Sequence, residues 1–153
     1  MDRKVVNPWD YPAPFILEVD VGEEDIDALG HANHSVYVKW LERCTWAHSW
    51  ELGITLADYR RLDRGVAVLR NEVDYLASAY QGERLLIATW IVSVQRIKLV
   101  RHFQVIRAAD AQILLRAITT FACVELSTGK PKRIPEAFAA GYISVLATEV
   151  SKT

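Results

Sequence analysis

Hydrophobic and polar residues alternate near the start of the chain and then change to a helical period. Residues 15–21 carry an apolar side chain at every second position, which predicts a strand, and the acid-rich residues 22–33 indicate turns. From His34 onward the apolar positions recur every three or four residues, at Val36, Tyr37, Trp40, Leu41, Cys44 and Ala47. Asn33 is a favoured N-cap and Gly53 a favoured stop, so a long and mostly buried helix is expected between them.

The rest of the chain is dominated by strand patterns. Residues 55–62 can form a short second helix. Four alternating or continuously apolar runs follow, at residues 69–75, 85–94, 99–105 and 113–123. The turns between them are short, which favours antiparallel neighbours. Residues 134–150 include Pro135-Glu136, a usual first helical turn, and predict a C-terminal helix.

This order of elements predicts an α+β fold in which an antiparallel sheet wraps around one long central helix. A single helix leaves the other face and the edge strands of the sheet exposed, and such folds usually cover them by pairing subunits. A homodimer or homotetramer is therefore expected. The prolines within residues 1–14 predict an extended N-terminal lead-in, and residues 15–153 are expected to form a single domain.

Composition and charge exclude several classes of protein. The chain has 153 residues, 51% of them hydrophobic, and a formal net charge of −1, so no basic balance favours nucleic acid. No apolar run approaches the ~20 residues of a membrane-spanning helix, and no signal-peptide core precedes Pro14. A soluble cytoplasmic protein is expected. Cys44 and Cys123 are interpreted as reduced thiols, and no metal site is expected because no ligand cluster has usable spacing.

The most specific pattern lies between Asp25 and Tyr37, with the sequence D-I-D-A-L-G-H-A-N-H-S-V-Y, followed by Trp40 and Glu42. It resembles the hot-dog-fold acyl-CoA thioesterases of the 4-hydroxybenzoyl-CoA thioesterase type. Their pattern is D-x-D-x-x-G, then His, Val, Asn or an aromatic residue, then Y-x-x-(Y/W)-x-E. Supporting similarities lie at residues 68–83 and 123–135, so the resemblance covers about residues 15–137.

The chemistry of thioester hydrolysis agrees with this resemblance. The reaction needs a carboxylate that attacks the carbonyl or activates water, and a donor aimed at the developing oxyanion. The first N–H groups of a helix are unpaired and partly positive, so they supply such a donor. Gly30 lets the loop before the helix bend in a conformation that a Cβ would oppose.

The resemblance also implies roles for individual residues. Asp27 matches the catalytic carboxylate, as nucleophile or general base, and His34 matches the position whose backbone N–H polarises the thioester carbonyl. The His34 side chain can also place water or substrate. His31 either lines the pocket or holds the loop through its ring. Asn33 and Tyr37 are candidate substrate-binding residues, although an N-cap role for Asn33 and a packing role for Tyr37 explain them more simply.

Two departures from the family pattern matter. Glu23 stands where one branch has a tyrosine, and Leu29 stands where the acyl-carrier-protein thioesterases have an asparagine. Two basic groups are candidates to bind the coenzyme's phosphates, Lys130, Lys132 and Arg133 after the last strand, or Arg96, Lys98 and Arg101.

The sequence thus predicts a thioester hydrolase that cleaves acyl-CoA to a free acid and CoA, with water as co-substrate and no cofactor. Three alternatives stay open on the same fold. An acyl-carrier-protein thioesterase would want a basic docking surface, which the near-neutral charge does not indicate. A dehydratase would need an acid–base pair, for which His31 and His34 are candidates in an otherwise dissimilar pattern. A non-catalytic acyl-CoA-binding protein would not need Asp27.

Overall fold

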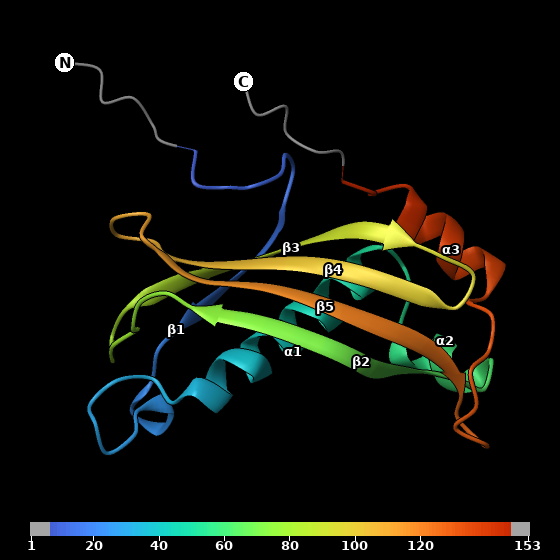
Figure 1. The fold of residues 1–153 in the computed structure, drawn as a ribbon, viewed down its shortest axis with the longest axis horizontal. Coiled ribbons are helices and arrows are strands. Elements are labelled where there is room, and N and C mark those ends of the chain that lie inside the picture. Colours follow the sequence, from blue (N-terminus) through green and yellow to red (C-terminus); the bar gives the residue numbers. More distant parts are fainter. Residues whose placement is uncertain (1–6, 148–153) are drawn as a thin grey trace.

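The computed structural model describes residues 7–147 and contains a five-stranded sheet with one long helix on its inner face (Figure 1). The elements are β1 (Phe15–Asp20), a 3-10 turn η1 (Glu23–Asp25), α1 (His34–Glu51), α2 (Leu56–Arg61), β2 (Arg64–Tyr75), β3 (Arg84–Val94), β4 (Lys98–Arg107), β5 (Ile113–Glu125) and α3 (Glu136–Ile143). The strand order is β1-β3-β4-β5-β2 and every pairing is antiparallel. The predicted α+β architecture is confirmed.

Helix α1 begins and ends where the sequence predicts. The Asn33 side chain accepts a hydrogen bond from the Ser35 N–H at 3.0 Å, and Gly53 takes the left-handed conformation after the last turn, with φ +81°. The apolar stripe of the helix packs on the sheet, and Cys44 at its centre is completely buried. Removing this stripe from water stabilises the fold by about 25 cal/mol for each Å² of apolar surface.

Strand β2 forms one edge of the sheet and carries several exposed apolar side chains. It pairs only with β5, and its register shifts between Val68 and Arg70. Val68 is 60% exposed and Leu69 is 55% exposed. A long edge strand with exposed apolar side chains is a surface on which another strand can pair.

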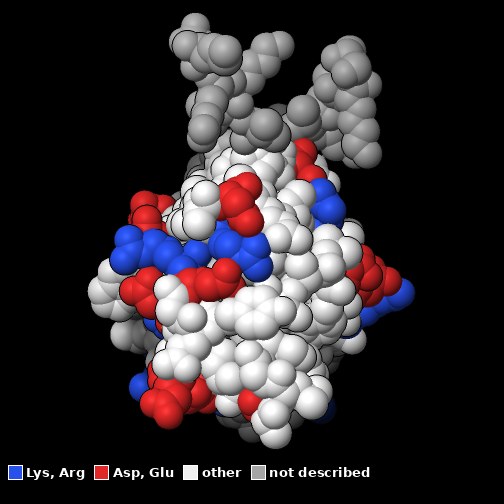
Figure 2. All heavy atoms as spheres, turned by 90° about the vertical axis from the view of Figure 1, so that its left-hand side faces the viewer, with Lys and Arg blue, Asp and Glu red and all other residues white. Residues whose placement is uncertain are grey.

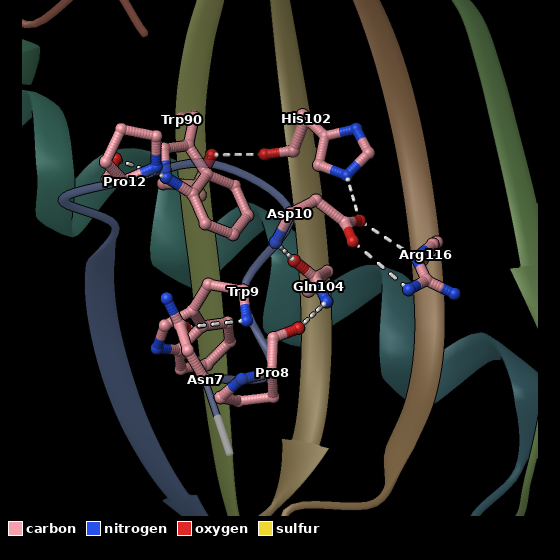
Figure 3. A network of polar contacts seen from close by, with 10 residues as sticks. Asn7, Pro8, Trp9, Asp10, Pro12, Trp90, His102, Gln104 and Arg116 are labelled. Carbon is pink, nitrogen blue, oxygen red and sulfur yellow. Dashed lines mark hydrogen bonds and ion pairs between the residues drawn. The ribbon is translucent and has the colours of Figure 1, made fainter. Parts of the chain in front are cut away.

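Residues 7–13, which we call the strap, cross the sheet face opposite α1 (Figure 3). The Asp10 carboxylate accepts hydrogen bonds from Arg116 Nε at 2.8 Å and from His102 Nε2 at 3.1 Å. Gln104 holds the backbone on both sides, accepting from the Asp10 N–H at 2.8 Å and donating to the Pro8 carbonyl at 3.0 Å. The strap therefore covers polar residues of β4 and β5 on the outer face.

The predicted C-terminal helix over residues 134–150 is wrong in its extent. Helix α3 ends at Ile143, and residues 148–150 lie outside the described residues. Strand β1 pairs with β3 only as far as Thr89, so the next part of the β3 edge is open. Leu146 bridges to Ile91 there, and the Ala147 N–H donates to the Ile91 carbonyl at 2.8 Å. Pairing with this edge replaces the last helical turns.

Among residues 7–147, no helix is both long enough and apolar enough to span a membrane.

Candidate active site

The loop from Asp27 to Asn33 folds back on itself immediately before α1. The Gly30 N–H donates to the Asp27 carbonyl at 3.0 Å, and the Asp27 N–H donates to the His31 carbonyl at 3.1 Å. Gly30 has φ +85°, a conformation that disfavours any side chain. The Ala32 N–H also donates to the Ala79 carbonyl at 2.9 Å, which ties the loop to the segment after β2.

This loop fixes the orientation of the Asp27 carboxylate. One oxygen accepts the Leu29 N–H at 2.9 Å, and the other faces the Asn33 side-chain amide at 3.5 Å. Asn33 thus contacts Asp27 with its amide nitrogen while its oxygen caps the helix. The carboxylate remains partly exposed, so it can meet a ligand or a water molecule.

The backbone N–H of His34 is free at the start of α1. Asn33 Oδ1 accepts both the Ser35 N–H at 3.0 Å and the Ser35 hydroxyl at 2.7 Å, and the Val36 N–H donates to the Asn33 carbonyl. Within the described residues, the His34 N–H has no hydrogen-bond partner. An unpaired N–H at a helix N-terminus is a donor for an oxyanion.

Four predicted site residues line one open cavity of about 400 Å³, namely Asp27, His31, His34 and Tyr37. Gly30 and Asn33 shape the adjoining loop. Tyr37 is buried, and its hydroxyl accepts the Ala79 N–H at 3.0 Å, so it also has the packing role that was predicted for it. The His31 ring lies 3.2 Å from the Ala32 carbonyl through Nδ1, which holds it against the loop.

Tyr75 completes this cavity, and the sequence did not single it out as a site residue. Its hydroxyl donates to the His34 carbonyl at 3.2 Å, and the two rings meet edge to face with centroids 6.4 Å apart. Tyr75 shares the alternation of Val73, which marked it as a strand residue only. No sequence pattern shows that the end of β2 meets the start of α1.

The predicted phosphate-binding residues Lys130, Lys132 and Arg133 lie at the other end of the sheet from Asp27. They follow β5, whose last residue, Glu125, pairs with Arg64 at the start of β2, whereas Tyr75 at the end of β2 meets His34 (Figure 1). Twelve strand residues separate these ends by about 36 Å. Within one chain, this basic run does not reach the cavity at Asp27.

The second candidate group for binding phosphates, Arg96, Lys98 and Arg101, is divided between two environments. Arg96 and Lys98 are exposed at the turn between β3 and β4, and Arg101 is fully buried beneath α1.

At the end of the molecule that carries the Asp27 loop, arginines lie against acids (Figure 2). Arg84 pairs with Asp20 at 3.1 Å, and Arg107 pairs with both Asp110 and Glu83. These pairs leave their guanidinium groups less available to a phosphate than unpaired arginines would be.

A five-stranded antiparallel sheet wrapped on one long helix defines a hot-dog fold. The family model described as the Thioesterase-like superfamily matches residues 21–141, and the chain belongs to this family. The predicted family resemblance, the predicted hot-dog fold and the predicted class of enzyme, a thioester hydrolase, are confirmed.

Individual similar proteins are consistent with this family assignment. The chain is 24% identical over 121 residues to YneP of Bacillus subtilis (strain 168), which bears the provisional name of an acyl-CoA thioesterase, and the match covers 79% of this chain and 87% of YneP. Slr0204 of Synechocystis, a 1,4-dihydroxy-2-naphthoyl-CoA thioesterase, has a TM-score of 0.79 at 20% identity, covering 86% and 96% of the two chains. SAV2348 of Staphylococcus aureus, solved in complex with CoA, has a TM-score of 0.82 at 16% identity, and the match covers 95% of this chain and 92% of SAV2348.

Proposed function

We propose that the protein is an acyl-CoA thioesterase that hydrolyses its substrate to a free acid and CoA. One observation supports this most strongly: Asp27 and His34, whose N–H has no partner among the described residues, line the same open cavity. The name of YneP and the CoA bound to SAV2348 favour a coenzyme A thioester over other thioesters.

In the proposed reaction the thioester carbonyl oxygen accepts a hydrogen bond from the His34 N–H. Negative charge grows on this oxygen as the carbonyl carbon becomes tetrahedral, and one donor of this kind commonly contributes about 3–4 kcal/mol. Asp27 either attacks the carbonyl carbon or takes a proton from an attacking water molecule. The CoA thiolate then leaves. If Asp27 attacked the carbonyl, its bond to the acyl group is an anhydride, and a water molecule then attacks the acyl carbon to release the free acid and Asp27. On either route one carboxyl oxygen of the free acid comes from water, and no metal or organic cofactor takes part.

In this proposal the neighbouring residues position the reacting groups and the substrate. Asn33 contacts the Asp27 carboxylate and caps α1, so it fixes the base and the oxyanion donor relative to each other. Gly30 provides the turn that returns the chain from Asp27 to the helix. His31, His34 and Tyr37 provide side-chain walls for the part of the substrate next to the thioester.

We further propose that the active form is a homodimer paired along β2. The apolar side chains on this edge would be covered by a second β2 running antiparallel about a two-fold axis. That pairing brings the Arg64 end of one strand beside the Tyr75 end of the other. The run from Lys130 to Arg133 of a second copy would then approach the Asp27 cavity, where it could bind the coenzyme's phosphates.

Thiol release from a panel of aromatic and aliphatic acyl-CoAs tests the reaction. We expect turnover of at least one substrate by the wild type, and a loss of about 10²-fold or more in Asp27→Asn, because a positioned base or nucleophile contributes on that scale. Glu24→Gln, an exposed acid three residues before Asp27, is the matched control and should keep wild-type activity. Binding of acyl-CoA without any thiol release would refute the enzyme assignment and favour a binding protein. An unimpaired Asp27→Asn would refute the role of Asp27 only.

A further inference from the structure

A second cavity, of about 270 Å³, lies between α1 and the inner face of the sheet. On α1 it is bordered by Val38, Leu41, Thr45 and Ser49, which continue at three- and four-residue spacing the face that begins with His34 in the first cavity. On β2 it is bordered by Val68 and Asn71, and β2 also supplies Tyr75 to the first cavity. The two cavities therefore follow one path along the helix and the edge strand.

The far end of this path contains a buried arginine. Arg101 of β4 is fully buried and is one of the residues that line the second cavity. Its Nη1 lies 2.9 Å from His48 Nδ1, and its Nη2 donates to Ser49 Oγ at 3.4 Å. Its Nε has no hydrogen-bond partner. Within residues 7–147 no Asp or Glu oxygen lies within 4.0 Å of these nitrogens.

An isolated buried charge is costly unless an anion or several hydrogen bonds compensate it. Burial lowers the pKa of Arg101, but arginine side chains stay protonated in proteins. Glu42 is also one of the residues that line the cavity, but it is exposed and stands two helical turns before Ser49, about 10 Å away along the axis. None of the described residues 7–147 thus gives the guanidinium an anionic partner.

Hydroxyl groups surround the same point. The Tyr142 hydroxyl lies 3.1 Å from Ser49 Oγ and 2.7 Å from the Tyr59 hydroxyl, and all three residues border the cavity. Tyr142 also places its ring 5.8 Å from the Arg101 guanidinium carbon. A guanidinium with hydroxyl donors beside it is the arrangement that binds a carboxylate, since both can donate to its oxygens.

We propose that Arg101 binds a carboxylate at the far end of the acyl group, so that the preferred substrates are CoA thioesters of dicarboxylic acids. This inference rests on the proposed thioesterase function and adds the substrate class. Fifteen residues of α1 separate His34 from Ser49, or about 22 Å along the helix axis. A thioester carbonyl at the His34 N–H and a carboxylate at Arg101 therefore require a long, extended acyl chain between them.

The test compares pairs of long-chain acyl-CoAs of equal length that end in a methyl group or in a carboxylate. We expect the wild type to favour the carboxylate-ended thioesters in kcat/KM by about 10- to 100-fold, the scale of a hydrogen-bonded charge pair. Arg101→Met should remove that preference and leave the methyl-ended substrates at least as active as before. Arg43→Met, which changes an exposed arginine of α1, should keep the preference.

Equal or better hydrolysis of the methyl-ended substrates by the wild type would overturn the inference, as would a preference that survives in Arg101→Met. The variant should fold, because an apolar side chain of similar volume often replaces a buried ion without loss of stability. If Arg101→Met does not fold, the wild-type preference in kcat/KM for carboxylate-ended thioesters decides by itself. If no substrate at all is hydrolysed, the thioesterase proposal fails separately. The rise in unfolding temperature caused by a free long-chain carboxylic acid then decides: a rise in the wild type that Arg101→Met lacks supports the site, and any other result refutes it.

Discussion

Acid should destabilise the folded protein through His48. This histidine is only 5% exposed, stacks on Phe15 with ring centroids 4.8 Å apart, and faces Arg101 at 2.9 Å. Burial, and after it the nearby charge of Arg101, together lower the pKa of His48 from 6.5 to about 4. In the folded state the neutral ring accepts the hydrogen bond of the guanidinium at Nδ1.

The size of the effect follows from this pKa. In the unfolded chain His48 takes up a proton near pH 6.5, whereas in the folded protein it stays neutral until about pH 4. The unfolded state therefore binds more protons in this window, and stability falls as the pH is lowered through it. The pKa difference corresponds to a loss of about 3 kcal/mol at pH 4, while above pH 6.5 the full stability is present.

Urea unfolding at pH 7 and pH 4, at one fixed protein concentration, measures this loss. His48→Gln keeps an acceptor for Arg101 but cannot take up a proton. We expect the wild type to lose about 3 kcal/mol more free energy of unfolding than His48→Gln between the two pH values. The comparison between pH values cancels any change that the substitution causes at pH 7. Equal losses in the two proteins would show that His48 is not held neutral, and would refute the reasoning.

Four further substitutions, one of them a control, probe the strap, the loop and the edge strand. Asp10→Ala removes the hydrogen bonds from Arg116 and His102 and should lower the free energy of unfolding by about 1 kcal/mol, since the pair is partly exposed; unchanged urea unfolding would contradict this. Gly30→Ala and Gly53→Ala both force an alanine into the left-handed region at about 1–2 kcal/mol, but only Gly30→Ala should also reduce thiol release. Val68→Lys should convert the proposed dimer to a monomer in light scattering.

The sequence predicted the elements well wherever one period persisted over many residues. The limits of α1 follow from Asn33 and Gly53, whose conformations are local and visible in the chain. The predicted strand at residues 69–75 is longer in the structure, where β2 begins at Arg64. The register shift after Val68 interrupts the alternation there, so a strict two-residue period could not reveal the first half of the strand.

Candidate site residues within a few positions of one another were predictable as a group, because the loop and the helix cap bring them together locally. Contacts between segments that are distant in the sequence were not predictable. Asp10 reaches Arg116 across the sheet, and neither residue stands out in the sequence. Arg101 did carry a signal, because it shares the alternation of Leu99 and Phe103 and so places a charge on the buried face.

The hydrogen bond from Tyr75 to the His34 carbonyl has a kinetic consequence. It attaches the first turn of α1, and with it the oxyanion donor, to the last residue of the edge strand that we propose as the dimer contact. A subunit that separates on dilution would release the end of β2 and loosen the helix start at the same time. The turnover per subunit should then fall at enzyme concentrations below the dimer dissociation constant, so dilution alone would act as a switch on catalysis.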